Sequence, residues 1–136
     1  MVSQTAEYAI HAVLYLAHTT GEPAVAQVIA QATGVPKGYL HKILRRLGKA
    51  GILGSQRGVG GGYILLNPAN QVSILEIIRA AELSRSKTHA TGSPHGQDPV
   101  HRLIERAAQR ADDVFGSTTL QDLIESGETP SVRASA

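Results

Sequence analysis

The sequence predicts a mainly α-helical chain with one small β-hairpin. Two short amphipathic segments flank the turn Thr33-Gly34-Val35, and the second has an apolar stripe opposite a cationic one. A glycine-rich run at 57–62 lies between two short strand candidates, and an apolar stripe of helical period occupies 99–116. This combination is typical of a winged helix-turn-helix domain followed by a long C-terminal dimerisation helix.

Length and composition favour one packed domain. The chain has 136 residues, of which 42% are hydrophobic and 18% are charged. It has no cysteine, which excludes disulfides, thiol catalysis, Cys-ligated zinc and Cys-ligated iron–sulfur clusters. No apolar run approaches the roughly 20 residues of a membrane span, and no signal segment opens the chain. We therefore expect a cytoplasmic protein without membrane contact.

Three helices are predicted in the first 50 residues. Apolar residues recur every three or four positions over 3–19 and 24–32, and Gly21-Glu22-Pro23 separates these two helices. Pro36 is expected at the first position of a third helix over 36–50. The apolar stripe of this third helix consists of Leu40, Ile43, Leu44 and Leu47.

Positive charge is concentrated on and just after the third helix. Residues 37–57 hold six of the 13 Lys and Arg residues and no acid, whereas the rest of the chain has seven basic against 11 acidic residues. Such a segment suits a polyanion such as DNA, although a solvated helix face gives the same pattern. The N-terminal side chains are best placed for base edges and the later ones for phosphates. The candidate contacts are Lys37, Gly38, Tyr39, His41, Lys42, Arg45, Arg46 and Lys49.

The glycine-rich run is predicted to form the tip of a hairpin, with strands at 52–53 and 63–66. Such a tip can approach a phosphate backbone, and an arginine in it can enter the minor groove. The run is not G-x-G-x-x-G, because Tyr63 takes the last position, and Asn67-Pro68 follows in place of a helix. A nucleotide site is therefore excluded. The candidate DNA contacts here are Arg57, Gly58, Gly60 and Gly61.

The C-terminal half is predicted to mediate dimerisation. A capping box at Ser73 opens a helix over 74–83, and Asp98-Pro99 opens the long helix. The expected organisation is a DNA-binding domain at 1–83, an effector-type loop at 84–98, dimerisation and short C-terminal helices at 99–125, and a flexible tail at 126–136. A second subunit is expected to cover the long stripe, the alternative being packing on the first helix. The stripe consists of Val100, Leu103, Ile104, Ala107, Ala108, Ala111, Val114 and Phe115.

The sequence resembles the Rrf-two (Rrf2) family of bacterial winged-helix transcriptional regulators over roughly residues 1–125. The matching segments are Tyr8-Ala9, 35–40, 44–51, Arg57 to Tyr63, 73–81, and Thr119-Leu120 with Leu123. The resemblance implies a homodimer with the third helix in a major groove, the wing in the adjacent minor groove, and the long helices crossing. The expected function is sequence-specific binding to a pseudo-palindromic operator as a repressor, the alternative being an activator. It also matches Gly38, His41 and Lys42 to positions that vary with the target sequence, and Arg57 to the wing arginine.

The chain departs from this family in its effector loop. Many members hold an iron–sulfur cluster through three cysteines there, and no cysteine is present here. The resemblance places Asp98 at the last cysteine position and His101 where one relative has a histidine ligand. Glu7 and His11 of one subunit, with His101 of the other and with His89 or His95 as an optional further ligand, could then hold zinc, copper, nickel or iron. The alternatives are ordinary surface histidines or a pH response, and no cofactor is expected.

Two further classes of function differ from DNA binding. A cysteine-free regulator could be controlled by a partner protein that docks on the 84–125 half. An enzyme is not expected, because the chain has no nucleophile elbow, HExxH, phosphate loop or paired-carboxylate motif.

Overall fold

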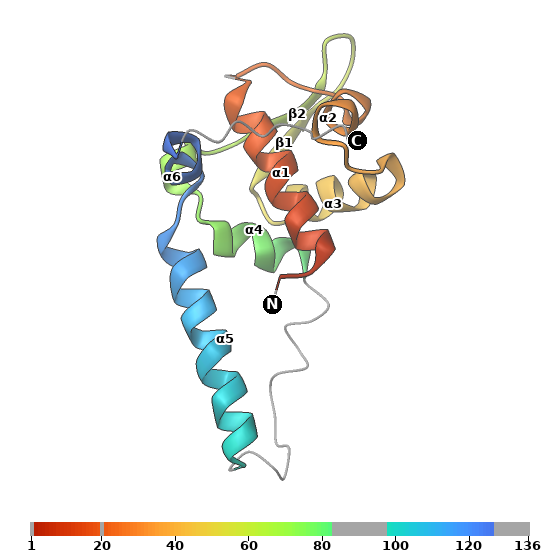
Figure 1. Cartoon of the computed structure of the whole chain (residues 1–136). Coiled ribbons are helices and arrows are strands. Elements are labelled where there is room, and N and C mark those ends of the chain that lie inside the picture. The colour runs from red at the N-terminus through yellow and green to blue at the C-terminus, as the bar shows by residue number, and fades with distance from the viewer. Residues whose placement is uncertain (1, 20, 83–97, 127–136) are drawn as a thin grey trace.

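The computed structural model describes residues 2–19, 21–82 and 98–126 (Figure 1). It confirms a mainly helical fold with one two-stranded hairpin. Positions 84–97 of the predicted effector loop and positions 127–136 of the predicted tail lie outside the described residues. The elements are α1 (Gln4–His18), α2 (Ala26–Thr33), α3 (Lys37–Lys49), β1 (Leu53–Gln56), β2 (Gly62–Leu65), the 3-10 turn η1 (Ala69–Gln71), α4 (Ile74–Ala81), α5 (Pro99–Ser117) and α6 (Leu120–Glu125).

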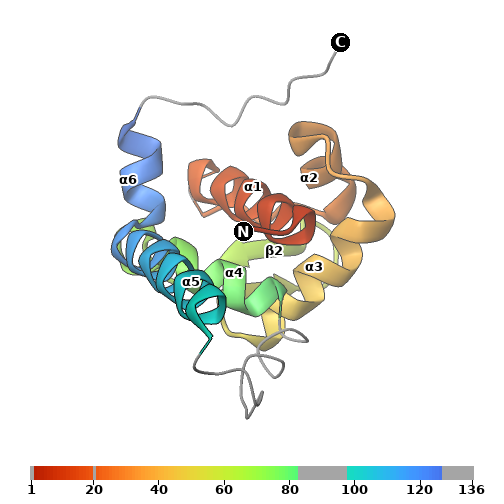
Figure 2. The same cartoon turned by 60° about the horizontal axis from the view of Figure 1, so that its bottom comes forward.

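Helix α1 lies at the centre of the fold. Its N-cap is Ser3, whose Oγ accepts a hydrogen bond of 3.2 Å from the backbone N–H of Ala6. The small residues Ala6, Ala9 and Ala12 are fully buried, which lets neighbouring helices approach closely. Figure 2 shows α1 over α4, with α2 and α3 on one side and α5 and α6 on the other.

The helix-turn-helix is formed by α2 and α3. Gly34 ends α2 in the left-handed conformation (φ 75°), and its N–H bonds to the Ala30 carbonyl at 2.9 Å. The expectation that Pro36 is the first residue of α3 is wrong. Pro36 is the N-cap, because its ψ of 132° is extended while its carbonyl accepts from Leu40 N–H.

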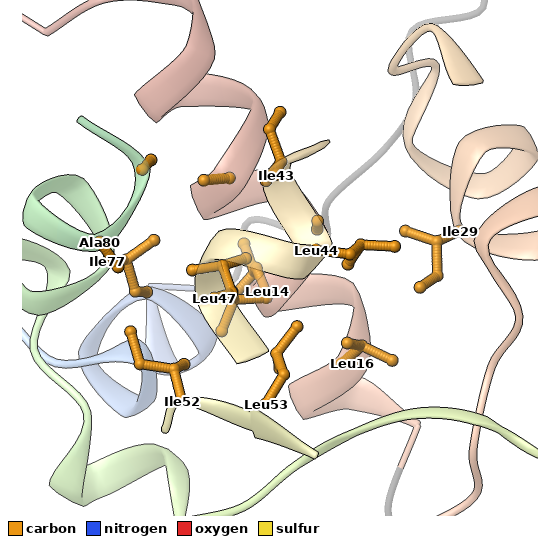
Figure 3. Packing of buried hydrophobic residues seen from close by; sticks show 14 of the residues in the cluster. Leu14, Leu16, Ile29, Ile43, Leu44, Leu47, Ile52, Leu53, Ile77 and Ala80 are labelled. Atoms are coloured by element: carbon orange, nitrogen blue, oxygen red, sulfur yellow. The ribbon is translucent and has the colours of Figure 1, made fainter. Parts of the chain in front are cut away.

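The buried core is formed mainly by α1, α2, α3, β1 and α4, which together with β2 are called the head below (Figure 3). Each side chain of the predicted apolar stripe of α3 is at most 1% exposed to solvent. It faces Leu14 and Leu16 of α1 and Ile29 of α2, with Leu53 of β1 and Ile77 of α4 nearby. Helix α3 is thus held by its inner face, and its outer face is exposed.

The hairpin is attached to the head by backbone hydrogen bonds. Strands β1 and β2 pair antiparallel with Leu53 opposite Leu65 and Gln56 opposite Gly62, so β1 is longer than predicted. Ala24 and Tyr63 exchange two bonds, of 3.0 and 2.8 Å, which adds a third backbone segment beside β2. The end of the hairpin next to its glycine-rich loop is therefore fixed against the segment that precedes α2.

Of the C-terminal helices, α5 packs on α4, and α6 packs on η1 and α1. Both predicted N-termini are confirmed: Ser73 and Glu76 form a capping box, and Asp98 caps α5 with Pro99 in its first turn. Ile74 N–H bonds to the Thr118 carbonyl at 2.9 Å and Leu120 N–H to the Val72 carbonyl at 3.0 Å. Helix α5 contacts α4 and then extends away from the head, at the opposite end from the hairpin tip (Figure 1). Within the described residues, no helix is both long and apolar enough to cross a bilayer.

Candidate nucleic-acid interface

The outer face of α3 consists of exposed polar and cationic residues. Lys37, Gly38, Tyr39, His41, Lys42, Arg45 and Lys49 are all exposed, while the four apolar residues between them are buried. The two-faced helix predicted from the sequence is therefore present. Nothing lies within 4 Å of a Cβ built at Gly38, so the backbone at the start of this helix is open to a ligand.

The cations on this face are not neutralised by the head. Among residues 2–19, 21–82 and 98–126, the single ion pair within 4.0 Å is His101 with Glu105 on α5. Lys37, Lys42 and Arg45 therefore have no carboxylate partner in the part of the chain that the structure describes. Helix α3 also has no acidic residue in its first turn. This face offers net positive charge together with the positive end of a helix dipole, which suits an anionic surface.

Arg46 differs from the other candidate contacts. Its side chain is partly buried, and Nη1 donates to the carbonyl oxygen of Ala81 at 2.8 Å. The carbonyl belongs to the last turn of α4, where a cation is favourable. Arg46 therefore joins α3 to α4 through one of the five N–H donors of its guanidinium, and its contact with phosphate stays a prediction.

Tyr39 packs on a second tyrosine. Its ring centroid lies 6.3 Å from that of Tyr8 on α1, with the planes tilted by 55°. This geometry is within the favourable range for aromatic pairs. Because Tyr39 is still 60% exposed, it supports the first turn of α3 and keeps one side of its ring free.

The wing tip, residues 57–61, is a thin loop. Arg57, Gly58 and Gly60 are exposed, and Gly61 N–H bonds to the Gly58 carbonyl at 3.0 Å. Gly58 and Gly60 have φ values of 96° and 80°, which side-chain-bearing residues rarely adopt. A Cβ at Gly61 would collide with the Gln56 carbonyl oxygen. The glycines are therefore required by the shape of the tip.

The predicted dimerisation stripe is uncovered over most of its length. Helix α5 has no buried residue, and Val100, Leu103, Ile104 and Val114 are 59–64% exposed. Ala107 and Ala108 are also exposed, Ala111 is half-buried, and Phe115 packs partly on the core. The alternative of intrachain packing on α1 does not cover the stripe, since α5 contacts the head mainly through α4.

The candidate metal ligands are not brought together within one subunit. Glu7 and His11 lie on α1, and His101 on α5 is paired with Glu105 at 3.0 Å. In the portion described, no three His, Asp or Glu side chains are placed to share an ion. His89 and His95 lie outside the described residues. A composite site between subunits stays a prediction.

Two structural roles were missed by sequence reasoning. The bridge between Ala24 and Tyr63 and the bond from Arg46 to Ala81 join residues that are 35 or more positions apart. Alternating or helical patterns contain no signal for such pairs. The only hint was that Arg46 lies nearer the apolar stripe of α3 than Arg45 does.

A helix-turn-helix with free cations on its second helix, followed by a glycine-tipped hairpin, defines a winged helix-turn-helix protein, a class that binds double-stranded DNA. The chain belongs to the Rrf2 family. The sequence model of this family, described as an iron-dependent transcriptional regulator, matches residues 2–126. The chain is thus a transcription regulator and not an enzyme.

Individual relatives agree with this assignment. A Neisseria meningitidis protein provisionally named an HTH-type transcriptional regulator is 36% identical over 87% of this chain and 83% of its own length. The regulator IscR of Xenorhabdus nematophila is 32% identical over 89% and 77%, respectively. The solved structure of CymR, the global cysteine regulator of B. subtilis, is 30% identical with a TM-score of 0.75, covering 90% of this chain and 95% of that one.

The family description names iron dependence, but this chain cannot hold an iron–sulfur cluster through cysteine ligands. A Cys-ligated cluster needs thiolates, and the sequence has none. The donors that remain on α1 and α5 are His and carboxylate side chains in groups of fewer than three, as far as the structure describes them.

Proposed function

We propose that the protein is a sequence-specific DNA-binding transcriptional repressor that acts in the cytoplasm as a homodimer on a pseudo-palindromic operator. The observation that carries this proposal is the row of exposed cations on α3, which have no carboxylate partner among the described residues, on a helix whose opposite face is buried. A rigid helix with one free basic face can lie in a major groove without rearranging the head.

Base reading is assigned to the first turns of α3. In helix-turn-helix proteins the N-terminal residues of the second helix contact base edges. Gly38 lets the backbone approach, and His41 and Lys42 supply the donors for base atoms. Arg45 and Lys49 are placed further along the helix and neutralise phosphates, while Arg57 on the wing enters the adjacent minor groove.

Dimerisation is assigned to the uncovered stripe of α5. Two copies of this helix crossing antiparallel at Ala107 would bring Val100 near the partner's Val114 and Leu103 near the partner's Ala111. The alanines at the centre allow close approach, and the larger side chains fill the flanks. A self-complementary stripe of this kind is what a two-fold symmetric interface requires, and it would position two reading helices on one operator.

Selection from a random-sequence duplex library tests this proposal. The protein should enrich one two-fold related sequence and bind it more tightly than a scrambled duplex of the same composition, by roughly 10³-fold or more. Equal affinity for the selected and scrambled duplexes would contradict sequence-specific binding. Placing the selected site over a promoter in an in vitro transcription assay then distinguishes repression from activation.

A further inference from the structure

The glycine run at 58–62 carries a single side chain, that of Val59. The other four positions are glycine. Val59 is 110% exposed relative to an extended reference, the highest value among the large apolar residues exposed in the described part of the chain. It thus contacts essentially none of the head, and core packing does not explain why an apolar residue stands there.

The loop that carries Val59 is held in place by its own turn and by the segment that precedes α2. Gly61 N–H closes the turn on the Gly58 carbonyl at 3.0 Å. A Cβ at Gly62 would lie 2.5 Å from the carbonyl carbon and oxygen of Ala24, so the chain passes directly against the start of α2. The valine is therefore displayed on a supported, narrow tip.

We propose that Val59 is an apolar wedge that enters the minor groove beside the base pairs read by α3 and packs against the deoxyribose walls. The inference rests on the proposed function. The minor groove is about 6 Å wide, so a loop without other side chains is suited to enter it. Minor-groove proteins commonly insert apolar side chains there.

Arg57 and Val59 then have separate tasks at the same tip. The guanidinium of Arg57 is attracted by the negative potential of the groove, which is stronger where the groove is narrow. Val59 makes contact with carbon and hydrogen atoms of the sugars, which carry no charge. The two contacts are distinguishable because only the first releases counterions.

The test compares Val59→Ser with Arg57→Ala, using the duplex that the wild-type protein selects. Leu66→Ser is the matched control, because Leu66 is a half-exposed apolar residue at the base of the same hairpin. Affinity is measured by fluorescence anisotropy at several salt concentrations. Protection of deoxyribose is measured by hydroxyl-radical footprinting, and thermal unfolding verifies the fold of each variant.

We expect Val59→Ser to weaken binding by about tenfold through lost apolar burial. Its salt slope and melting temperature should equal those of the wild type, and sugar protection should be lost at the wing position alone. Arg57→Ala should lower the salt slope as well as the affinity. Binding by Val59→Ser equal to that of the wild type or of Leu66→Ser would overturn the inference and leave the proposed function standing. A wild-type protein that selects no duplex would instead refute the proposed function and the inference with it.

Discussion

Nη1 of Arg46 donates a hydrogen bond of 2.8 Å to the carbonyl oxygen of Ala81. This bond joins α3 to the last turn of α4. The next residue, Glu82, accepts from the backbone N–H of Ser3 at 3.1 Å, so the same turn also holds the start of α1. The end of α4 is therefore the junction between the head and the segment that leads to α5.

Replacing Arg46 by Ala should lower the free energy of unfolding by about 1–2 kcal/mol, because a partly buried charged hydrogen bond is lost. The matched control is Arg45→Ala. Arg45 is exposed and has no carboxylate partner among the residues described, so its loss should leave stability within about 0.5 kcal/mol. Chemical denaturation measures both. Equal stabilities for the two variants would contradict the internal role of Arg46.

Salt dependence should separate Arg45 from Arg46 on DNA. Removing a phosphate contact lowers the slope of log affinity against log salt by about 0.9. We expect this change for Arg45→Ala and no change in slope for Arg46→Ala. A reduced slope in both variants would show that Arg46 contacts a phosphate as well as the Ala81 carbonyl.

His41→Ala should change which duplex is preferred. His41 is exposed in the second turn of α3, and each good base contact contributes roughly 1–3 kcal/mol to discrimination. Repeating the selection with the variant should relax one position in each half-site while the salt slope stays constant. An unchanged preferred sequence would show that His41 does not read a base.

Leu103→Asp should convert the dimer to a monomer. Leu103 is 64% exposed on the α5 stripe, and a carboxylate there would be desolvated in the proposed interface. Gln109→Ala on the opposite face of the same helix is the control and should leave the dimer intact. Sedimentation velocity measures the mass of each. A wild-type protein that sediments as a monomer would contradict the dimer itself.

Gly62→Ala should disrupt the contact between the hairpin and the segment at Ala24. The new Cβ would lie 2.5 Å from the Ala24 carbonyl at a φ of 146°, so the bridge to Tyr63 must open. We expect a loss of roughly 2–4 kcal/mol in stability. Gly60→Ala meets nothing within 4 Å and should cost only the backbone strain, about 1–2 kcal/mol. Comparable unfolding midpoints for the two variants would contradict the close approach at Ala24.

The protein purified without chelator should contain no stoichiometric metal per dimer. No three donor side chains gather within the described part of one subunit, and His101 is engaged with Glu105. Elemental analysis measures this directly. Metal near one equivalent per site that disappears in His11→Ala and His101→Ala would instead establish the composite site between subunits.

Local patterns in the sequence determined most of the elements and their exposed faces. The alternation of Leu40 and its neighbours with cations located α3 and its buried side, and Gly34 located the end of α2. The capping box at Ser73 located the start of α4. These predictions succeed because periodicity, capping and left-handed turns depend on residues within about one helical turn of each other.

The tertiary structure alone decided which distant groups meet. It paired Arg46 with Ala81, joined Ala24 to Tyr63 beside the hairpin, and set α5 against α4 while its stripe stayed exposed. Each of these depends on the path of the chain between residues far apart, on which local propensity has no bearing. The sequence thus determined that this chain carries a basic reading helix and a glycine-tipped wing. The fold decided how freely each cation can bind, because Arg46 is partly buried with one N–H donor bonded to a backbone carbonyl, whereas Arg45 is exposed.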